Sequence, residues 1–290
     1  MLSDYKLFLK HLYIKVSNNK ITFLLILILG LTIEMLSFYN GNVTNSTAYL
    51  GVLLLCVLLI EFYTFIRPIK KEWLIKKARQ ENIMVMFCIF ISYCILAIRF
   101  LVIDDFQATD KSIKIALMVF VGLFIYPVFL AFYFLRLKNY KLKEIGFGNW
   151  KCFWVAFPII IMFAIVAFGI MPDKIQFGDI IEEKGVLSLI TLGFLTAAIP
   201  EEFTRLLFQT RLGKVLSNRG LGWFIASFIW AMGHIFIFSN QTQDYLGAFI
   251  SAIGIFPLGL FWGYLTEKFK SMIPSVLIHG TNLWGIQNIF

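Results

Sequence analysis

The chain has 290 residues, of which 59% are hydrophobic and 15% charged, and its formal net charge is +9. So apolar a composition excludes an ordinary soluble domain and predicts an all-α, polytopic membrane helix bundle. All four cysteines lie within apolar runs and lack the spacing of a zinc site. They indicate small buried hydrophobic side chains rather than disulfides or redox chemistry: Cys56, Cys88, Cys94 and Cys152.

Residues 1–11 mix lysines with Leu, Phe and Tyr and predict a helix at the membrane interface. The apolar windows that follow are each long enough to cross a bilayer, so we expect about eight or nine transmembrane helices. The first window is too long for the apolar part of a signal peptide and is expected to be retained. The windows cover residues 21–39, 48–66, 83–103, 115–135, 152–171, 186–210, 221–239, 246–265 and 272–290.

The lysines and arginines are distributed unevenly between the loops. If the windows alternate in direction, 19 of the 26 lie in the N-terminal segment and in every second loop, whereas the opposite loops hold 4. Because basic loops stay in the cytoplasm, we predict a multi-pass cell-membrane protein with a cytoplasmic N-terminus. The excess positive charge therefore indicates the membrane topology and an attraction to anionic lipid. It does not indicate a nucleic-acid partner.

Two adjacent acidic residues, Glu201 and Glu202, interrupt the sixth apolar window. An ionisable side chain costs about 2.5–3.5 kcal/mol near the centre of a bilayer, which favours a polar cavity, a partner or chemistry at this position. Arg205 follows both acids at helical spacing and can pair with either. Pro200 directly precedes them, and a proline within a helix commonly kinks it and opens a pocket. A structural ion pair between helices is the alternative interpretation.

Two of the three histidines also lie inside apolar windows, in the same C-terminal third of the chain. Trp230 and His234 share one helix face, and His279 and Asn282 share another. A lone histidine in an apolar helix is more often a satisfied core residue. Here, however, both histidines are expected at about the same membrane depth as the two glutamates, so we predict one shared site.

This set of side chains favours hydrolysis. A carboxylate can act as general base toward water, and a histidine can share the activated water. A histidine and an asparagine can donate hydrogen bonds to a tetrahedral oxyanion. The sequence contains no HExxH, GxSxG or catalytic-cysteine pattern, so the familiar zinc, serine and cysteine proteases are not indicated.

The order and spacing of these residues resemble the CPBP family of CAAX prenyl-protease and bacteriocin-processing intramembrane proteases, also called the Abi family. The family motifs are EExxxR, FxxxH and HxxxN or a close variant. They correspond to the segments Glu201–Arg205, Trp230–His234 and His279–Asn282. The chain differs from the motifs in three places: Arg205 and Asn282 each stand one residue early, and Trp230 replaces phenylalanine.

The resemblance covers about residues 140–290 and implies that this part is the protease core. Residues 1–139 would then hold the interfacial helix and four transmembrane helices of unrecognised type. The implied substrate is a membrane-associated peptide or protein in the lipid bilayer. The short loops and the many Phe, Ile, Lys and Asn residues indicate a bacterial protein, which disfavours a prenylated CAAX protein as the substrate.

Carried over residue by residue, the resemblance implies a glutamate-type intramembrane endopeptidase with six catalytic-site residues. They form a water-activating pair, an orienting pair and an oxyanion-binding pair, namely Glu201 with His234, Glu202 with Arg205, and His279 with Asn282. No cofactor is implied. Two histidines and a glutamate could instead bind zinc with one open coordination position, which is the alternative.

Two other classes of function stay open. A non-catalytic membrane protein, acting in bacteriocin self-immunity or signalling, could keep the polar cluster for folding. A transporter could relay protons through the acidic pair, but the sequence shows no inverted repeat of the kind that many transporters have.

The predicted topology can be tested with cysteines introduced into residues 104–114 and 136–151, in a variant whose four native cysteines are replaced by alanine. In intact cells a membrane-impermeant maleimide should label the first loop, and it should label the second only after permeabilisation, because basic loops face the cytoplasm. Labelling of residues 136–151 in intact cells would contradict the predicted orientation.

Overall fold

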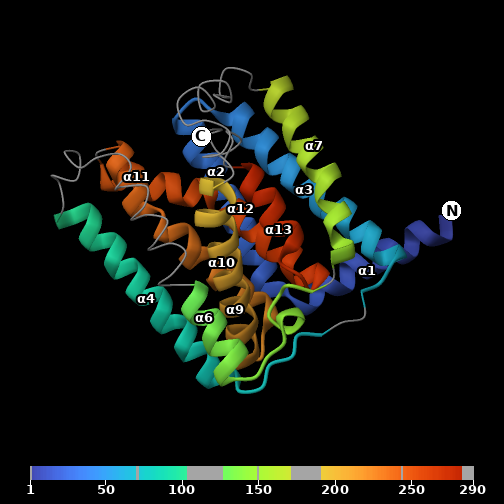
Figure 1. The fold of residues 1–290 in the computed structure, drawn as a ribbon. Coiled ribbons are helices and arrows are strands. Elements are labelled where there is room, and N and C mark those ends of the chain that lie inside the picture. Colours follow the sequence, from blue (N-terminus) through green and yellow to red (C-terminus); the bar gives the residue numbers. More distant parts are fainter. Residues whose placement is uncertain are drawn as a thin grey trace. The chain divides into compact units, whose positions relative to one another are not determined.

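The computed structural model describes residues 2–69, 72–102, 127–148, 150–170, 191–242 and 244–282 (Figure 1). Every regular element in these ranges is a helix, and they contain no β-strand, which confirms the all-α prediction. The chain forms two compact units, Met1–Lys71 and Glu72–Phe290. By packing, α4 lies in the same unit as the C-terminal helices.

The first unit contains three helices: α1 (Leu2–Asn18), α2 (Lys20–Tyr39) and α3 (Val43–Ile66). Helices α2 and α3 form a hairpin, across which the hydroxyl of Ser46 donates to Glu34 at 2.9 Å. Helix α1 packs Phe8 edge-on against Phe62 of α3, with ring centroids 5.5 Å apart. The other carboxylate of this hairpin, Glu61 of α3, pairs with Lys15 of α1 at 2.5 Å, so both membrane-helix carboxylates have a polar partner.

The second unit contains the remaining helices, several of which are short or irregular. They are α4 (Ala78–Val102), α6 (Phe129–Phe132), the π-helix η3 (Tyr133–Leu137), the 3-10 turns η4 (Leu142–Glu144) and η5 (Trp150–Cys152), α7 (Phe153–Ile170), the π-helix η7 (Thr191–Ala198), α9 (Ile199–Val215), α10 (Arg219–Gly233), α11 (Ile235–Thr242), α12 (Tyr245–Phe269) and α13 (Ile273–Asn282).

Within the described residues, four helical segments are long and apolar enough to cross a membrane: Lys20–Tyr39, Val43–Ile66, Arg219–Ser239 and Tyr245–Phe269. They match the first, second, seventh and eighth predicted windows. The described residues of the third and fifth windows are also helical, up to the ends of α4 and α7. The fourth, sixth and ninth windows extend into residues outside the described ranges. The architecture is that of a membrane helix bundle.

Among the described helices, α9 is the most polar and also one of the most enclosed, since α4, α10, α12 and α13 pack on it (Figure 1), as does η7. Its buried residues include Glu202, Arg205, Gln209 and Arg211. Buried charged groups are costly unless they are paired and hydrogen-bonded, so this helix dictates which polar groups its neighbours must supply.

The interruption expected at Pro200 takes the form of a change in helix type. The π-helix η7 ends at Ala198 and runs directly into α9, and Pro200 lies in the first turn of α9. π-Helical turns are rare and frequently occur at functional sites. The two glutamates follow directly, in the same first turn of α9.

A second buried ion pair joins α9 to α4 and was not singled out in the sequence. Nε of Arg211 lies 3.1 Å from Oε2 of Glu81, and both side chains are fully buried. The hydroxyl of Tyr140 donates to Oε1 of Glu81 at 2.8 Å and accepts from the backbone N–H of Lys76 at 2.7 Å. Burial raises the pKa of Tyr140 to about 12, so the hydroxyl keeps its proton at neutral pH. The network holds two predicted cytoplasmic loops against α9.

Replacing Arg211 by methionine should lower the thermal midpoint of the detergent-solubilised protein strongly, because breaking a buried pair leaves an uncompensated charge at a cost of about 3–5 kcal/mol. The double variant Arg211→Met with Glu81→Leu should recover much of this loss. Arg219→Met is the matched control, since Arg219 pairs with Glu72 on the exposed surface and such pairs contribute little. Equal midpoints for Arg211→Met and the control would contradict the assignment.

Candidate active site

The two adjacent glutamates of α9 lie in different surroundings, because neighbouring side chains on a helix point about 100° apart. Glu202 points into the bundle and has no exposed surface. The side chain of Glu201 lies at the edge of the cluster and is 28% exposed. Helix geometry therefore separates one enclosed carboxylate from one accessible carboxylate.

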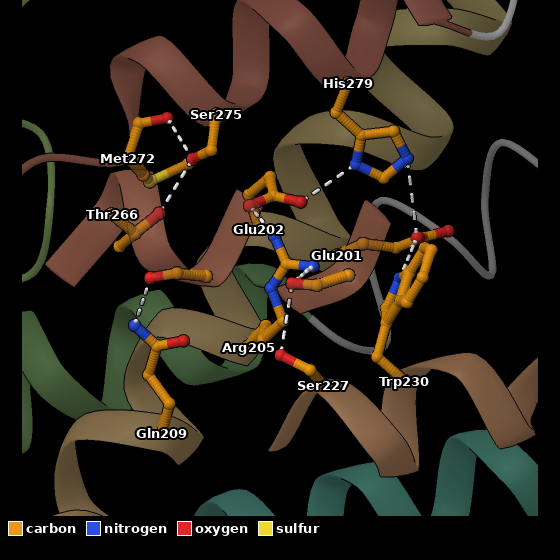
Figure 2. A network of polar contacts seen from close by, with 12 residues as sticks. Glu201, Glu202, Arg205, Gln209, Ser227, Trp230, Thr266, Met272, Ser275 and His279 are labelled. Carbon is orange, nitrogen blue, oxygen red and sulfur yellow. Dashed lines mark hydrogen bonds and ion pairs between the residues drawn. The ribbon is translucent and has the colours of Figure 1, made fainter. Parts of the chain in front are cut away.

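Arg205 pairs with Glu202 rather than with Glu201. Its Nη2 donates to Oε2 of Glu202, and its Nη1 donates to the carbonyl oxygen of Gly259 at 3.0 Å (Figure 2). The guanidinium carbon also lies 5.5 Å and 5.6 Å from the ring centroids of Trp230 and Trp262. A planar guanidinium suits this site, since it can bond in two directions and lie against aromatic rings at once.

Helix α12 approaches α9 and α10 closely because two glycines, Gly259 and Gly263, lie four residues apart on one face. A Cβ atom on Gly259 would lie 2.6 Å from a ring carbon of Trp230. The carbonyl of Gly259 accepts from Ser227 as well as from Arg205, and the carbonyl of Gly263 accepts from Gln209 at 3.1 Å. The glycines thus expose backbone acceptors that satisfy the polar face of α9.

His279 of α13 bridges the two glutamates. Its Nδ1 lies 2.9 Å from Oε1 of Glu202, and its Nε2 lies 3.7 Å from Oε2 of Glu201. Because the Glu202 carboxylate is the acceptor, Nδ1 carries a proton and Nε2 faces Glu201. The imidazole stacks on Trp262 with the ring centroids 3.9 Å apart and the planes 10° apart. Its ring orientation is therefore set from two directions.

His234 joins the cluster through Trp230. It follows the last residue of α10, and its Nδ1 lies 3.0 Å from the carbonyl oxygen of Trp230. A carbonyl only accepts, so Nδ1 is the donor and Nε2 is left for another partner. The indole of Trp230 meets the His234 ring edge-on, with centroids 4.5 Å apart, and donates its own N–H to Glu201 at 2.5 Å.

Four of the six predicted residues, Glu201, Glu202, Arg205 and His279, thus lie in direct contact. His234 contacts the same cluster, whereas Asn282 ends α13 and its side chain lies outside the described part. Among the described residues, no group of three His, Cys, Asp or Glu side chains is arranged to hold a metal ion.

Sequence reasoning missed the contacts that complete this cluster. Trp230 was treated as a replacement for phenylalanine, although its N–H reaches a glutamate. Trp262 was not singled out, and neither were the carbonyls exposed at Gly259 and Gly263. The four-residue spacing of these two glycines in an apolar helix was the available signal, because it is typical of close helix contacts.

A surface pocket lies further along α9 and contains none of the six predicted residues. It is lined by Glu72, Trp73, Ile75, Gln209, Thr210, Lys214, Arg219, Trp223 and Glu267. This pocket is therefore separate from the cluster around Glu201, His234 and His279.

The arrangement has an inner and an outer part. The inner part, Glu202 and Arg205, is enclosed and fully engaged in hydrogen bonds. The outer part combines the accessible carboxylate of Glu201 with Nε2 of His279, 3.7 Å away, while His234 joins it through Trp230. A carboxylate beside an imidazole can accept and return protons, which is what hydrolysis by an activated water needs.

Residues 183–284 match the family described as Type II CAAX prenyl endopeptidase Rce1-like. This segment includes all six predicted residues and confirms the family resemblance deduced from the motifs. The comparison with curated proteins and the comparison with solved structures each gave no match.

Adding a methyl group at Gly259 should disturb the cluster without touching a charged side chain. Gly259→Ala should lower the thermal midpoint, since overpacking a filled contact costs about 1–3 kcal/mol, and it should change the near-ultraviolet circular dichroism of the displaced tryptophan. Gly51→Ala is the control, because nothing lies within 4 Å of a Cβ atom at that helical position. If both variants kept the wild-type midpoint, the close approach of α12 to Trp230 would be refuted.

Proposed function

We propose, from the family match of residues 183–284, that the protein is an intramembrane endopeptidase that cleaves a membrane-associated protein or peptide precursor. The observation that carries this proposal is the accessible carboxylate of Glu201, which lies 3.7 Å from an imidazole nitrogen whose other nitrogen is anchored on Glu202. A poised base beside an oriented histidine is the minimum that a metal-independent peptide hydrolase requires.

In the proposed reaction, Glu201 takes a proton from a water molecule as the water oxygen attacks the scissile carbonyl carbon. The Nε2 atom of His234 is available to accept the second hydrogen bond of this water. The carbonyl oxygen becomes an oxyanion, toward which His279, when protonated on both nitrogens, and Asn282 would donate. The proton held by Glu201 then passes to the departing amine, and the C–N bond breaks.

Glu202 is poorly suited to be the base. It has no exposed surface, one of its oxygens accepts from Arg205 and the other accepts from His279. A carboxylate that is saturated in this way orients its neighbours instead of exchanging protons with water. We therefore assign the pair Glu202–Arg205 to positioning and Glu201 to chemistry, in agreement with the roles that the family resemblance implies.

The four apolar helices and the family match support a membrane location for this activity. The predicted cytoplasmic N-terminus places the acidic turn of α9 in the cytoplasmic half of the bilayer, so the substrate would reach it from that side. We propose that the reaction needs no metal. Zinc held by Glu201, His234 and His279 is the alternative that a chelator distinguishes.

Glu201→Gln should abolish proteolysis by the protein in proteoliposomes, because an amide keeps the side-chain shape but cannot accept the proton of water. Loss of a general base typically costs about 10²–10⁴ in rate. The thermal midpoint should stay near the wild-type value. Glu202→Gln is the contrasting variant: it should lower both activity and midpoint, since it leaves the buried Arg205 without its counter-ion.

The substrates for this test are a panel of membrane-anchored peptides with and without a prenyl group. If Glu201→Gln were as active as the wild type on a peptide that the wild type cleaves, Glu201 would not be the general base. Absence of cleavage of every peptide by the wild type, together with a stable fold, would favour the non-catalytic alternative. Activity lost to a strong chelator and restored by zinc would overturn the metal-independent mechanism.

A further inference from the structure

We propose that Trp230 is a positioning residue, whose indole N–H holds the carboxylate of Glu201 in the orientation needed for water activation. This inference rests on the proposed function, because it concerns the same base. It assigns a role to the one motif position at which this chain carries tryptophan instead of phenylalanine.

The geometry at Glu201 separates its two carboxylate oxygens. The indole Nε1 of Trp230 donates to Oε2 at 2.5 Å, and the same Oε2 faces Nε2 of His279 at 3.7 Å. The other oxygen, Oε1, has no hydrogen-bond partner in the part of the chain that the structure describes, and Figure 2 shows it pointing away from the network. Two groups thus hold one oxygen and leave the second available to water.

Trp230 is itself held rigidly. Its indole is 9% exposed and lies against the bare Cα of Gly259. It meets the Trp262 ring edge-on, with centroids 5.2 Å apart, and it meets the His234 ring edge-on as well, with centroids 4.5 Å apart. Because these contacts already fix the indole, its N–H loses no conformational freedom when it binds the carboxylate of Glu201. This is the condition for a preorganised site.

The hydrogen bond matters because the terminal torsion of a glutamate side chain is soft. Without a partner, the carboxylate plane turns over a broad range, and both oxygens sample many directions. A phenylalanine at position 230 would keep most ring contacts but would offer no N–H. The tryptophan therefore adds one function to the aromatic packing: it selects which oxygen of Glu201 is presented.

The chain offers a closely matched control in Trp223, which lies two turns earlier on α10. Its indole packs against Gly263 of α12, as that of Trp230 packs against Gly259. It also donates a hydrogen bond, but to the backbone carbonyl of Leu260 at 2.9 Å. Trp223→Phe and Trp230→Phe therefore each remove an indole N–H from a ring that lies against a glycine of α12, and only the second removes a bond to Glu201.

The test compares kcat, KM and thermal midpoint for the two variants in the full-length protein, on a peptide that the wild type cleaves. Trp230→Phe should lower kcat by about 10-fold to 100-fold with KM unchanged, as expected for a lost hydrogen bond to a charged group that matters in the transition state. Trp223→Phe should keep kcat and KM near the wild-type values. Both variants should lose a similar amount of thermal stability.

A second measurement does not depend on activity. Ultraviolet resonance Raman spectra contain an indole band that responds to hydrogen bonding of the N–H group. The wild-type minus Trp230→Phe difference spectrum should contain the band of a strongly bonded indole. In Glu201→Ala, which removes the acceptor, that band should move to the position of a weakly bonded indole. This variant keeps the test valid even if Trp230→Phe does not fold.

The outcomes separate this inference from the proposed function. If Glu201→Gln is inactive but Trp230→Phe and Trp223→Phe have equal kcat, Trp230 has only a packing role and the inference is overturned. A band that stays unchanged in Glu201→Ala overturns it as well. If Glu201→Gln stays fully active, the proposed base fails, and with it any positioning role for Trp230, whatever the Raman spectra report about the bond.

Discussion

The buried ion pair between Glu202 and Arg205 is the constraint that organises the candidate site. A charged pair within a membrane bundle is tolerated only if its remaining hydrogen-bonding groups are also satisfied. Nη1 of Arg205 donates to the carbonyl of Gly259 on α12. The second oxygen of the Glu202 carboxylate, Oε1, accepts from His279 on α13. The hydrogen bonds of this one ion pair therefore position α12 and α13 against α9. Removing either partner would leave the other charge buried without compensation, which is strongly destabilising.

This constraint also explains why two adjacent acids serve better than one. The enclosed acid, Glu202, anchors one nitrogen of His279, so that the other nitrogen is directed toward Glu201. The guanidinium donates to Glu202 and to Gly259, so the accessible acid keeps one oxygen for water. A one-residue step along a helix places the orienting group and the reacting group side by side but in different environments, without any loop or lid between them.

Contacts within α9 could be predicted from the sequence because helical spacing fixes which residues face each other over one turn. The pairing of Arg205 with an acid is of this kind. Helical spacing could not decide between Glu202 and Glu201, since that choice depends on carbonyl and imidazole groups from other helices; only the family resemblance implied Glu202. The Arg211–Glu81 pair, separated by 130 positions, has no local signal at all. At Pro200 the sequence predicted an interruption but not the change from π-helix to α-helix. A proline indicates where a helix is disturbed, but it does not indicate which helix type results.

The two tryptophans of α10 pack against α12 in a similar way, but their N–H groups bond to different acceptors. Trp223 and Trp230 each seat an indole on a glycine of α12, and the glycines, like the tryptophans, recur at helical spacing. At position 223 the N–H meets a backbone carbonyl, which serves only the helix contact. At position 230 the same geometry meets a carboxylate, because α9 brings Glu201 to that level of the bundle. The indole at position 230 therefore both packs against α12 and orients the carboxylate of Glu201. A phenylalanine at that position would pack in a similar way but could not orient the carboxylate.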